Sequence, residues 1–142
     1  MKYTQICYLH QTPHQSIKLP FTNGEVIKKI SFLECHSEQN NYGINSNEPS
    51  LIFSICGFDT NYYLGADRNS DFQFTASVPL NSVGSFAWSR PSYMHFDDFH
   101  DPSRSWFTNE LHIDILKDDG SKLPITEWNL SMFHVKLLVG YD

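Results

Sequence analysis

The chain has 142 residues, 40% of them hydrophobic and 15% aromatic, so it can bury a core without disulfide bonds, and disorder is excluded. Its formal net charge is −6, 18% of its residues are charged, and its longest basic cluster is the pair Lys28-Lys29. A protein that neutralises several phosphates needs a clustered basic face, so no nucleic-acid partner is expected.

The first predicted strand covers Tyr3–Leu9, a run rich in residues that favour β structure. The same stretch lacks the apolar centre of a signal peptide, and the chain never approaches the ~20 consecutive apolar residues of a membrane span. We therefore expect synthesis in the cytoplasm and no membrane partner. A second strand is predicted over Val26–Leu33, after the turn residues Thr22-Asn23-Gly24.

The middle of the chain carries two further strand patterns. After the long polar segment His36–Pro49, the run Leu51–Phe58 is apolar on both faces, which is typical of a central strand. After a break at Leu64–Asp67, the run Asp71–Val78 alternates between apolar and polar residues, so it is predicted as one half-buried strand. Its apolar face contains Phe72, Phe74, Ala76 and Val78.

The last third of the chain contains two more alternating runs. The first begins at Glu110 and is followed by the turn residues Lys117–Gly120, which predict a hairpin. The second is Phe133–Val139. One face of each strand must be dry. The residues expected in the core from these runs and the preceding one are Phe72, Phe74, Ile113, Ile115, Val135 and Leu137.

Seven or eight short strands, separated by turn signals, predict an all-β fold with the form of an antiparallel β-sandwich, as one domain over residues 1–142. A single jelly roll of about eight strands in two sheets fits this length. An immunoglobulin-like sandwich is the nearest alternative, although its Cys…Trp…Cys spacing is missing.

The three cysteines have neither CxxC nor zinc-ligand spacing. Their odd number excludes a complete disulfide framework within one chain. Cys7 and Cys56 lie in apolar, strand-like runs and are interpreted as small buried hydrophobic residues. The alternative is one disulfide with one free thiol.

The segment Phe86–Phe107 is unusually rich in aromatic residues, contains two prolines and is predicted to be a loop. The loop could fold over one end of the sandwich and bury its own rings, it could form a subunit interface, or it could stack on sugar rings. The residues that we single out as interface or ligand candidates are Trp88, Tyr93, Phe96, Phe99, Trp106 and Phe107.

Two sets of polar residues have the composition of chemical sites. His95, Asp97 and the distant His134 have the composition of an iron site of the cupin type, but such a set in a loop is more often a solvated surface, and no metal or other cofactor is predicted. His112, Asp114, His134 and Lys136 lie on the polar faces of two strands that could be neighbours. Acid–base chemistry is one interpretation, and cross-strand polar pairing is favoured.

The chain contains no nucleophile-elbow serine, phosphate loop or HExxH helix, so no catalytic residue is predicted and the protein is not expected to be an enzyme. A cupin-like metal enzyme is the third-ranked hypothesis for its function.

A resemblance covers about a third of the chain. From Leu111 to Ile125 a strand leads through Asp118-Asp119-Gly120 to a Leu-Pro step, and Val135–Leu138 forms a last apolar strand. This pattern, with Val78–Ser85 before it, resembles the single-jelly-roll capsid proteins of Polinton-like elements and related DNA viruses.

The resemblance implies a viral structural protein: a capsid vertex (penton) subunit, a minor capsid protein or a spike head. The implied partners are further copies of the chain, as a pentamer or a trimer, with other capsid proteins as possible neighbours, and the implied location is the virion. The alternative function is a carbohydrate- or receptor-binding sandwich, for which the aromatic loop would supply the contacts.

Overall fold

A computed structural model describes residues 2–20, 25, 27–36, 50–79, 87–89, 110–117, 119–125 and 133–142. Within these ranges the chain forms ten strands and one short 3-10 turn, η1 (Arg68–Ser70). The strands are β1 (Lys2–His10), β2 (His14–Lys18), β3 (Ile27–His36), β4 (Ser50–Ile55), β5 (Asn61–Tyr63), β6 (Phe72–Phe74), β7 (Ala76–Pro79), β8 (Ala87–Ser89), β9 (Glu110–Leu116) and β10 (Phe133–Tyr141).

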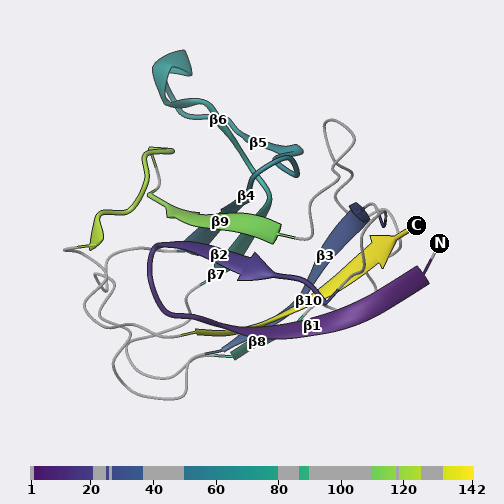
Figure 1. The fold of residues 1–142 in the computed structure, drawn as a ribbon. Coiled ribbons are helices and arrows are strands. Elements are labelled where there is room, and N and C mark those ends of the chain that lie inside the picture. The colour runs from purple at the N-terminus through teal and green to yellow at the C-terminus, as the bar shows by residue number, and fades with distance from the viewer. Residues whose placement is uncertain are drawn as a thin grey trace.

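Eight of these ten strands form two antiparallel sheets, with the orders β1-β10-β3-β8 and β2-β9-β4-β7, which lie face to face (Figure 1). The pairing is nested, because β1 pairs with β10, β2 with β9, β3 with β8 and β4 with β7. Such nesting is what results when one long hairpin folds over on itself, which is the topology of a jelly roll. The predicted antiparallel β-sandwich with about eight strands is therefore confirmed.

The core lies between the two sheets and follows the predicted alternation in the last third of the chain. Ile113 and Ile115 of β9 and Val135 and Leu137 of β10 are all buried, as predicted. In β9, and over Phe133–Val139 of β10, every second residue is more exposed than its neighbours. The period of two thus assigned the dry face of both strands correctly.

The central strand of the second sheet was also predicted correctly, but it is shorter than expected. β4 lies between β9 and β7, and both of its faces carry buried residues. It ends at Ile55, and the chain turns at Cys56-Gly57, where Gly57 has a φ of 91° that favours glycine. Phe58 follows this turn and is buried.

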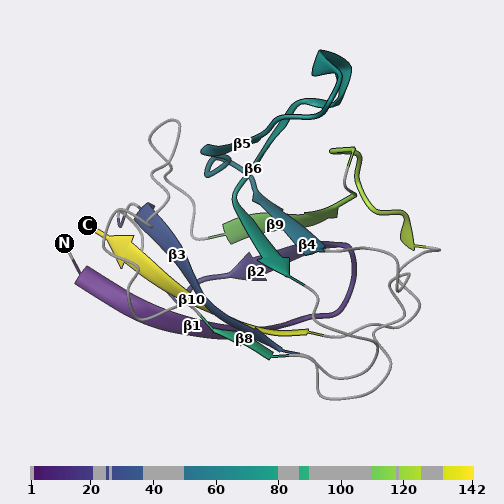
Figure 2. The ribbon, with the colours of Figure 1, turned by 180° about the vertical axis from the view of Figure 1, so that it is seen from behind.

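The prediction of one strand over Asp71–Val78 was wrong. The chain bends at Thr75, so β6 pairs with β5 in a separate two-stranded sheet, while β7 pairs with β4 in the sandwich. Thr75 is buried, and its polar groups are satisfied there. Its amide donates to the carbonyl of Phe53 (2.8 Å), and its hydroxyl accepts from the amide of Ile55 (2.8 Å). Phe72 and Phe74 are only half-buried, because they belong to the β5–β6 hairpin, which projects from the sandwich (Figure 2).

The cysteine interpretation also needs correction. All three cysteines are free, but Cys7 and Cys56 are exposed and Cys35 is the buried one. Cys7 occupies an outward position in β1, and Cys56 lies in the turn after β4. Burial raises the pKa of the Cys35 thiol to about 12, so this thiol stays protonated at neutral pH.

Candidate functional site

The structure describes little of the predicted aromatic site. Trp88 lies in β8, where its backbone is paired with that of Cys35 in β3. The five other candidates, Tyr93, Phe96, Phe99, Trp106 and Phe107, lie outside the described residues, as do His95 and Asp97. Their role at an interface or a ligand site stays a prediction.

The second predicted set is split between the two sheets. His112 and Asp114 belong to β9, whereas His134 and Lys136 belong to β10, and these strands lie in different sheets. The expectation that the two strands are neighbours was therefore wrong. His112 and Asp114 therefore belong to one sheet, and His134 and Lys136 to the other.

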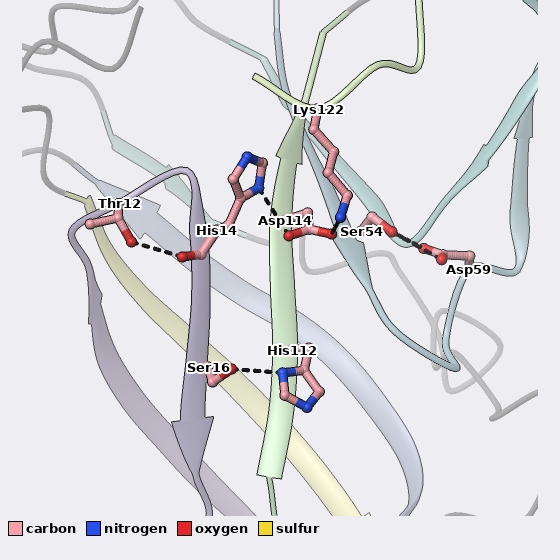
Figure 3. A network of polar contacts seen from close by, with 8 residues as sticks. All are labelled: Thr12, His14, Ser16, Ser54, Asp59, His112, Asp114 and Lys122. Atoms are coloured by element: carbon pink, nitrogen blue, oxygen red, sulfur yellow. Dashed lines mark hydrogen bonds and ion pairs between the residues drawn. The ribbon is translucent and has the colours of Figure 1, made fainter. Parts of the chain in front are cut away.

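The outer face of β2 and β9 carries a row of cross-strand contacts (Figure 3). His14 Nδ1 lies 3.0 Å from Asp114 Oδ1, and Ser16 Oγ lies 2.6 Å from His112 Nδ1. Lys122 Nζ lies 3.5 Å from the other carboxylate oxygen of Asp114. The strand register produces this row, because His14 is opposite Asp114 and Ser16 is opposite His112.

These contacts suit strand pairing better than catalysis. The serine contacts His112 and the aspartate contacts His14, so these four side chains do not form one Ser–His–Asp proton relay. Cross-strand polar pairs of this kind contribute about 0.2–1 kcal/mol each. Among the described residues, no group of three or more His, Cys, Asp or Glu side chains is placed to hold a metal ion.

The outer face of the other sheet contains a pocket of about 350 Å³. The rings of His36 and His134 stack at its edge, with centroids 5.0 Å apart and planes 11° apart. Beside them the Lys136 ammonium lies 3.4 Å from the Glu34 carboxylate. The residues that line the pocket are Cys7, Tyr8, Leu9, Glu34, His36, His134, Val135 and Lys136.

The β5–β6 hairpin carries the most exposed apolar surface of the described chain. Tyr62 is 68% exposed and Leu64 is 74% exposed, and Tyr63 beside them is exposed as well. The ring of Tyr63 stacks on Phe72 of β6, with centroids 5.0 Å apart. Exposed apolar residues that gather on one projection mark an interaction site more often than scattered ones do.

Polar contacts clamp the root of this hairpin to the sandwich. The Asp59 carboxylate accepts hydrogen bonds from Ser54 Oγ (2.8 Å) and from Thr75 Oγ1 (3.0 Å). Asn61 Nδ2 donates to the carbonyl of Thr75 (2.7 Å). The chain therefore leaves β4 and re-enters β7 through one bonded cluster. Partial burial raises the pKa of Asp59, against the opposing effect of the two hydroxyl donors.

Replacement of Asp59 by alanine is expected to lower the free energy of unfolding by about 1–3 kcal/mol, because it removes the acceptor for the Ser54 and Thr75 hydroxyls. Urea denaturation followed by fluorescence measures this change. Ser77→Ala serves as the control, because Ser77 is exposed on the neighbouring strand β7 and its loss is expected to stay within about 0.5 kcal/mol. Equal values for the two variants would show that the clamp does not stabilise the fold.

Sequence reasoning missed the hairpin, although a signal was present. The run Tyr62-Tyr63-Leu64 places three apolar residues directly before the turn at Gly65, and Phe72 and Phe74 follow the turn. Two short β-forming runs around a turn are the mark of a hairpin. The alternation of apolar and polar residues runs unbroken through Asp71–Val78, so this pattern gave no sign that β6 and β7 are separate strands.

Comparisons with known proteins show a likeness in structure and none in sequence. No family model matches the chain, and no curated protein matches it. The crystal structure of the selenomethionine-labelled mavirus penton protein superposes with a TM-score of 0.56 at 8% sequence identity, covering 100% of both chains. At this identity the likeness shows the fold, and it supports the jelly-roll topology derived above from the strand pairing.

Proposed function

We propose that this chain is a structural protein of a viral capsid, a vertex subunit that assembles into a ring of five copies. The observation that carries the proposal is the likeness to the mavirus penton protein, which extends over the whole of both chains. A likeness of that extent includes more than the few strands that unrelated sandwiches share. In this role the protein is located in the virion and its work is assembly rather than catalysis.

The surface of the described chain supports an assembling protein. Tyr62 and Leu64 project into solvent, and a monomer gains nothing from such exposure. The low share of charged residues, 18%, limits repulsion between identical copies. Rotational symmetry lets one pair of complementary patches satisfy every subunit in a ring.

A carbohydrate- or receptor-binding head is the second candidate, because exposed tyrosines such as Tyr62 can stack on sugar rings. The two candidates differ in what they need. A capsid subunit binds other copies of itself with no glycan present, whereas a binding module gives a glycan signal that disappears in Tyr62→Ala.

The test is the mass of the purified full chain at micromolar concentration, by light scattering and native mass spectrometry. We expect a species of five times the chain mass of 16.5 kDa. A trimer would favour a spike head over a vertex subunit. A monomer at all concentrations, with no assembly when capsid proteins from the same source are added, would contradict the proposal.

A further inference from the structure

We infer that the β5–β6 hairpin of one copy docks into the pocket on the outer face of the β1-β10-β3-β8 sheet of the next copy. This inference rests on the proposed ring assembly and names the two surfaces that would meet in it. The occupant of the pocket is thus a second copy of this chain, and the contact is head-to-tail.

Hydrogen bonds hold the tip of the hairpin in one conformation. At its tip the amide of Gly65 donates to Asp71 Oδ1 (2.9 Å), and Ser70 Oγ donates to Asp67 Oδ1 (2.7 Å). An isolated two-stranded hairpin is marginally stable in water, so these bonds and the clamp at its root hold the exposed side chains in place. A rigid projection loses little conformational entropy when it binds.

A second brace comes from the turn after β9. Gly120 has a φ of 85°, and a Cβ atom at this position would lie 2.6 Å from the Phe72 ring. The Phe72 ring therefore lies against the backbone of this turn, and the Tyr63 ring stacks on the Phe72 ring. This packing ties the hairpin, which projects from the sandwich in Figure 1, to the turn after β9.

The pocket is complementary to the hairpin tip in size and chemistry. Its volume of about 350 Å³ lies in the range of sites that hold small organic molecules, about 300–1,000 Å³, and so can accept a tyrosine or leucine side chain. Its lining combines apolar side chains with His36 and His134, whose ring N–H groups can donate to a carboxylate, while Lys136 is already paired with Glu34. The tip carries the carboxylates of Asp67 and Asp71 beside Leu64, with Arg68 as its one basic residue.

The position of the two surfaces favours a ring over a two-fold dimer. The hairpin projects from the side of the β2-β9-β4-β7 sheet (Figures 1 and 2). The residues that line the pocket belong to β1, β3 and β10 of the other sheet. A copy can therefore offer its hairpin to one neighbour and its pocket to another. Contacts of this head-to-tail kind close into rings when the rotation between copies is right.

Cysteine trapping tests the inference, because Cys7 lines the pocket and is exposed. In a Cys56→Ser background, Leu64→Cys places a thiol on the hairpin. With a disulfide oxidant added, we expect a ladder of cross-linked species that ends at five copies on a non-reducing gel. The further change Cys7→Ser should abolish the ladder, and Ser77→Cys in place of Leu64→Cys should give none, since Ser77 is exposed away from the hairpin.

A second variant measures the contribution of the hairpin without cross-linking. Tyr62→Ser with Leu64→Ser removes two exposed side chains, so the melting temperature of the monomer should change little, while the concentration needed for assembly should rise at least tenfold. Ile125→Ser is the matched control, because Ile125 is 69% exposed outside the hairpin, and it should assemble as the unchanged protein does.

The outcomes separate this inference from the proposed function. A pentamer that forms in the unchanged protein, but gives no cross-link through Cys7 and survives the double serine variant, would overturn the docking and leave the vertex role in place. Cross-links that stop at dimers would overturn the head-to-tail contact. A monomeric unchanged protein would overturn both.

Discussion

Replacement of Phe53 by alanine is expected to lower the free energy of unfolding by about 3–5 kcal/mol. Phe53 lies in the central strand β4, and its side chain is fully buried. Its ring centroid lies 4.9 Å from that of Phe32 and 5.8 Å from that of His10, and both of these residues belong to the opposite sheet. Loss of the ring therefore opens a cavity between the sheets, which the surrounding strands fill only in part.

Urea denaturation at matched protein concentration measures the effect, since assembly would make stability depend on concentration. Ile125→Ala is the control, because truncation of a side chain that is 69% exposed and lies outside the hairpin should cost no more than about 0.5 kcal/mol. A loss below about 1 kcal/mol for Phe53→Ala would show that the two sheets are not held together at this point.

Acidification from neutral pH to pH 4 is expected to remove about 3 kcal/mol of stability through His10 alone. His10 is fully buried at the end of β1, and desolvation lowers its pKa from 6.5 to about 4, although backbone contacts with Pro13 and Thr12 oppose the shift. Its Nδ1 lies 3.1 Å from the hydroxyl of Tyr8, and burial raises the pKa of Tyr8, so both partners are neutral at pH 7.

The sign follows from where the proton binds. In the unfolded chain His10 takes up a proton as the pH falls below about 6.5, whereas in the native state it does so only near pH 4. The stability contributed by neutral His10 is thus complete above pH 6.5 and is lost progressively as the pH falls to about 4. The raised pKa of Asp59 acts in the opposite direction, because a carboxyl that binds its proton more tightly in the native state stabilises the fold as the pH falls.

The measurement is a series of urea denaturation curves between pH 7.5 and pH 4, for the unchanged protein and for His10→Phe. Phenylalanine keeps a ring next to Tyr8 and Phe53 but cannot take up a proton. The variant should therefore lose much less stability than the unchanged protein over this range. Parallel pH profiles for the two proteins would show that His10 is not the group responsible.

Local patterns were informative wherever one strand alone decides which face is dry. The alternation in β9 and β10 placed Ile113 and Leu137 in the core, and the apolar run around Phe53 identified a central strand. Three strands were not predicted at all: β2, β5 and β8 contain only five, three and three residues. Runs this short carry too few positions for a period of two to stand out from chance.

The sequence by itself predicted the fold class and the dry faces of β9 and β10, and its last third resembles capsid jelly rolls. Only the tertiary structure decided which strands are neighbours, and therefore which polar residues meet. His112 bonds Ser16 of β2 rather than a residue of β10, and His134 stacks on His36. The hairpin likewise depends on tertiary contacts, because Thr75 forms hydrogen bonds with Asp59 and Ile55. These bonds hold the bend that divides the alternating run Asp71–Val78 into β6 and β7. The physical reason is the distance along the chain between the residues that interact. The dry face of a strand follows from residues two positions apart, so a local pattern shows it. Strand pairing joins segments as distant as Ser16 and His112, and no local pattern contains both.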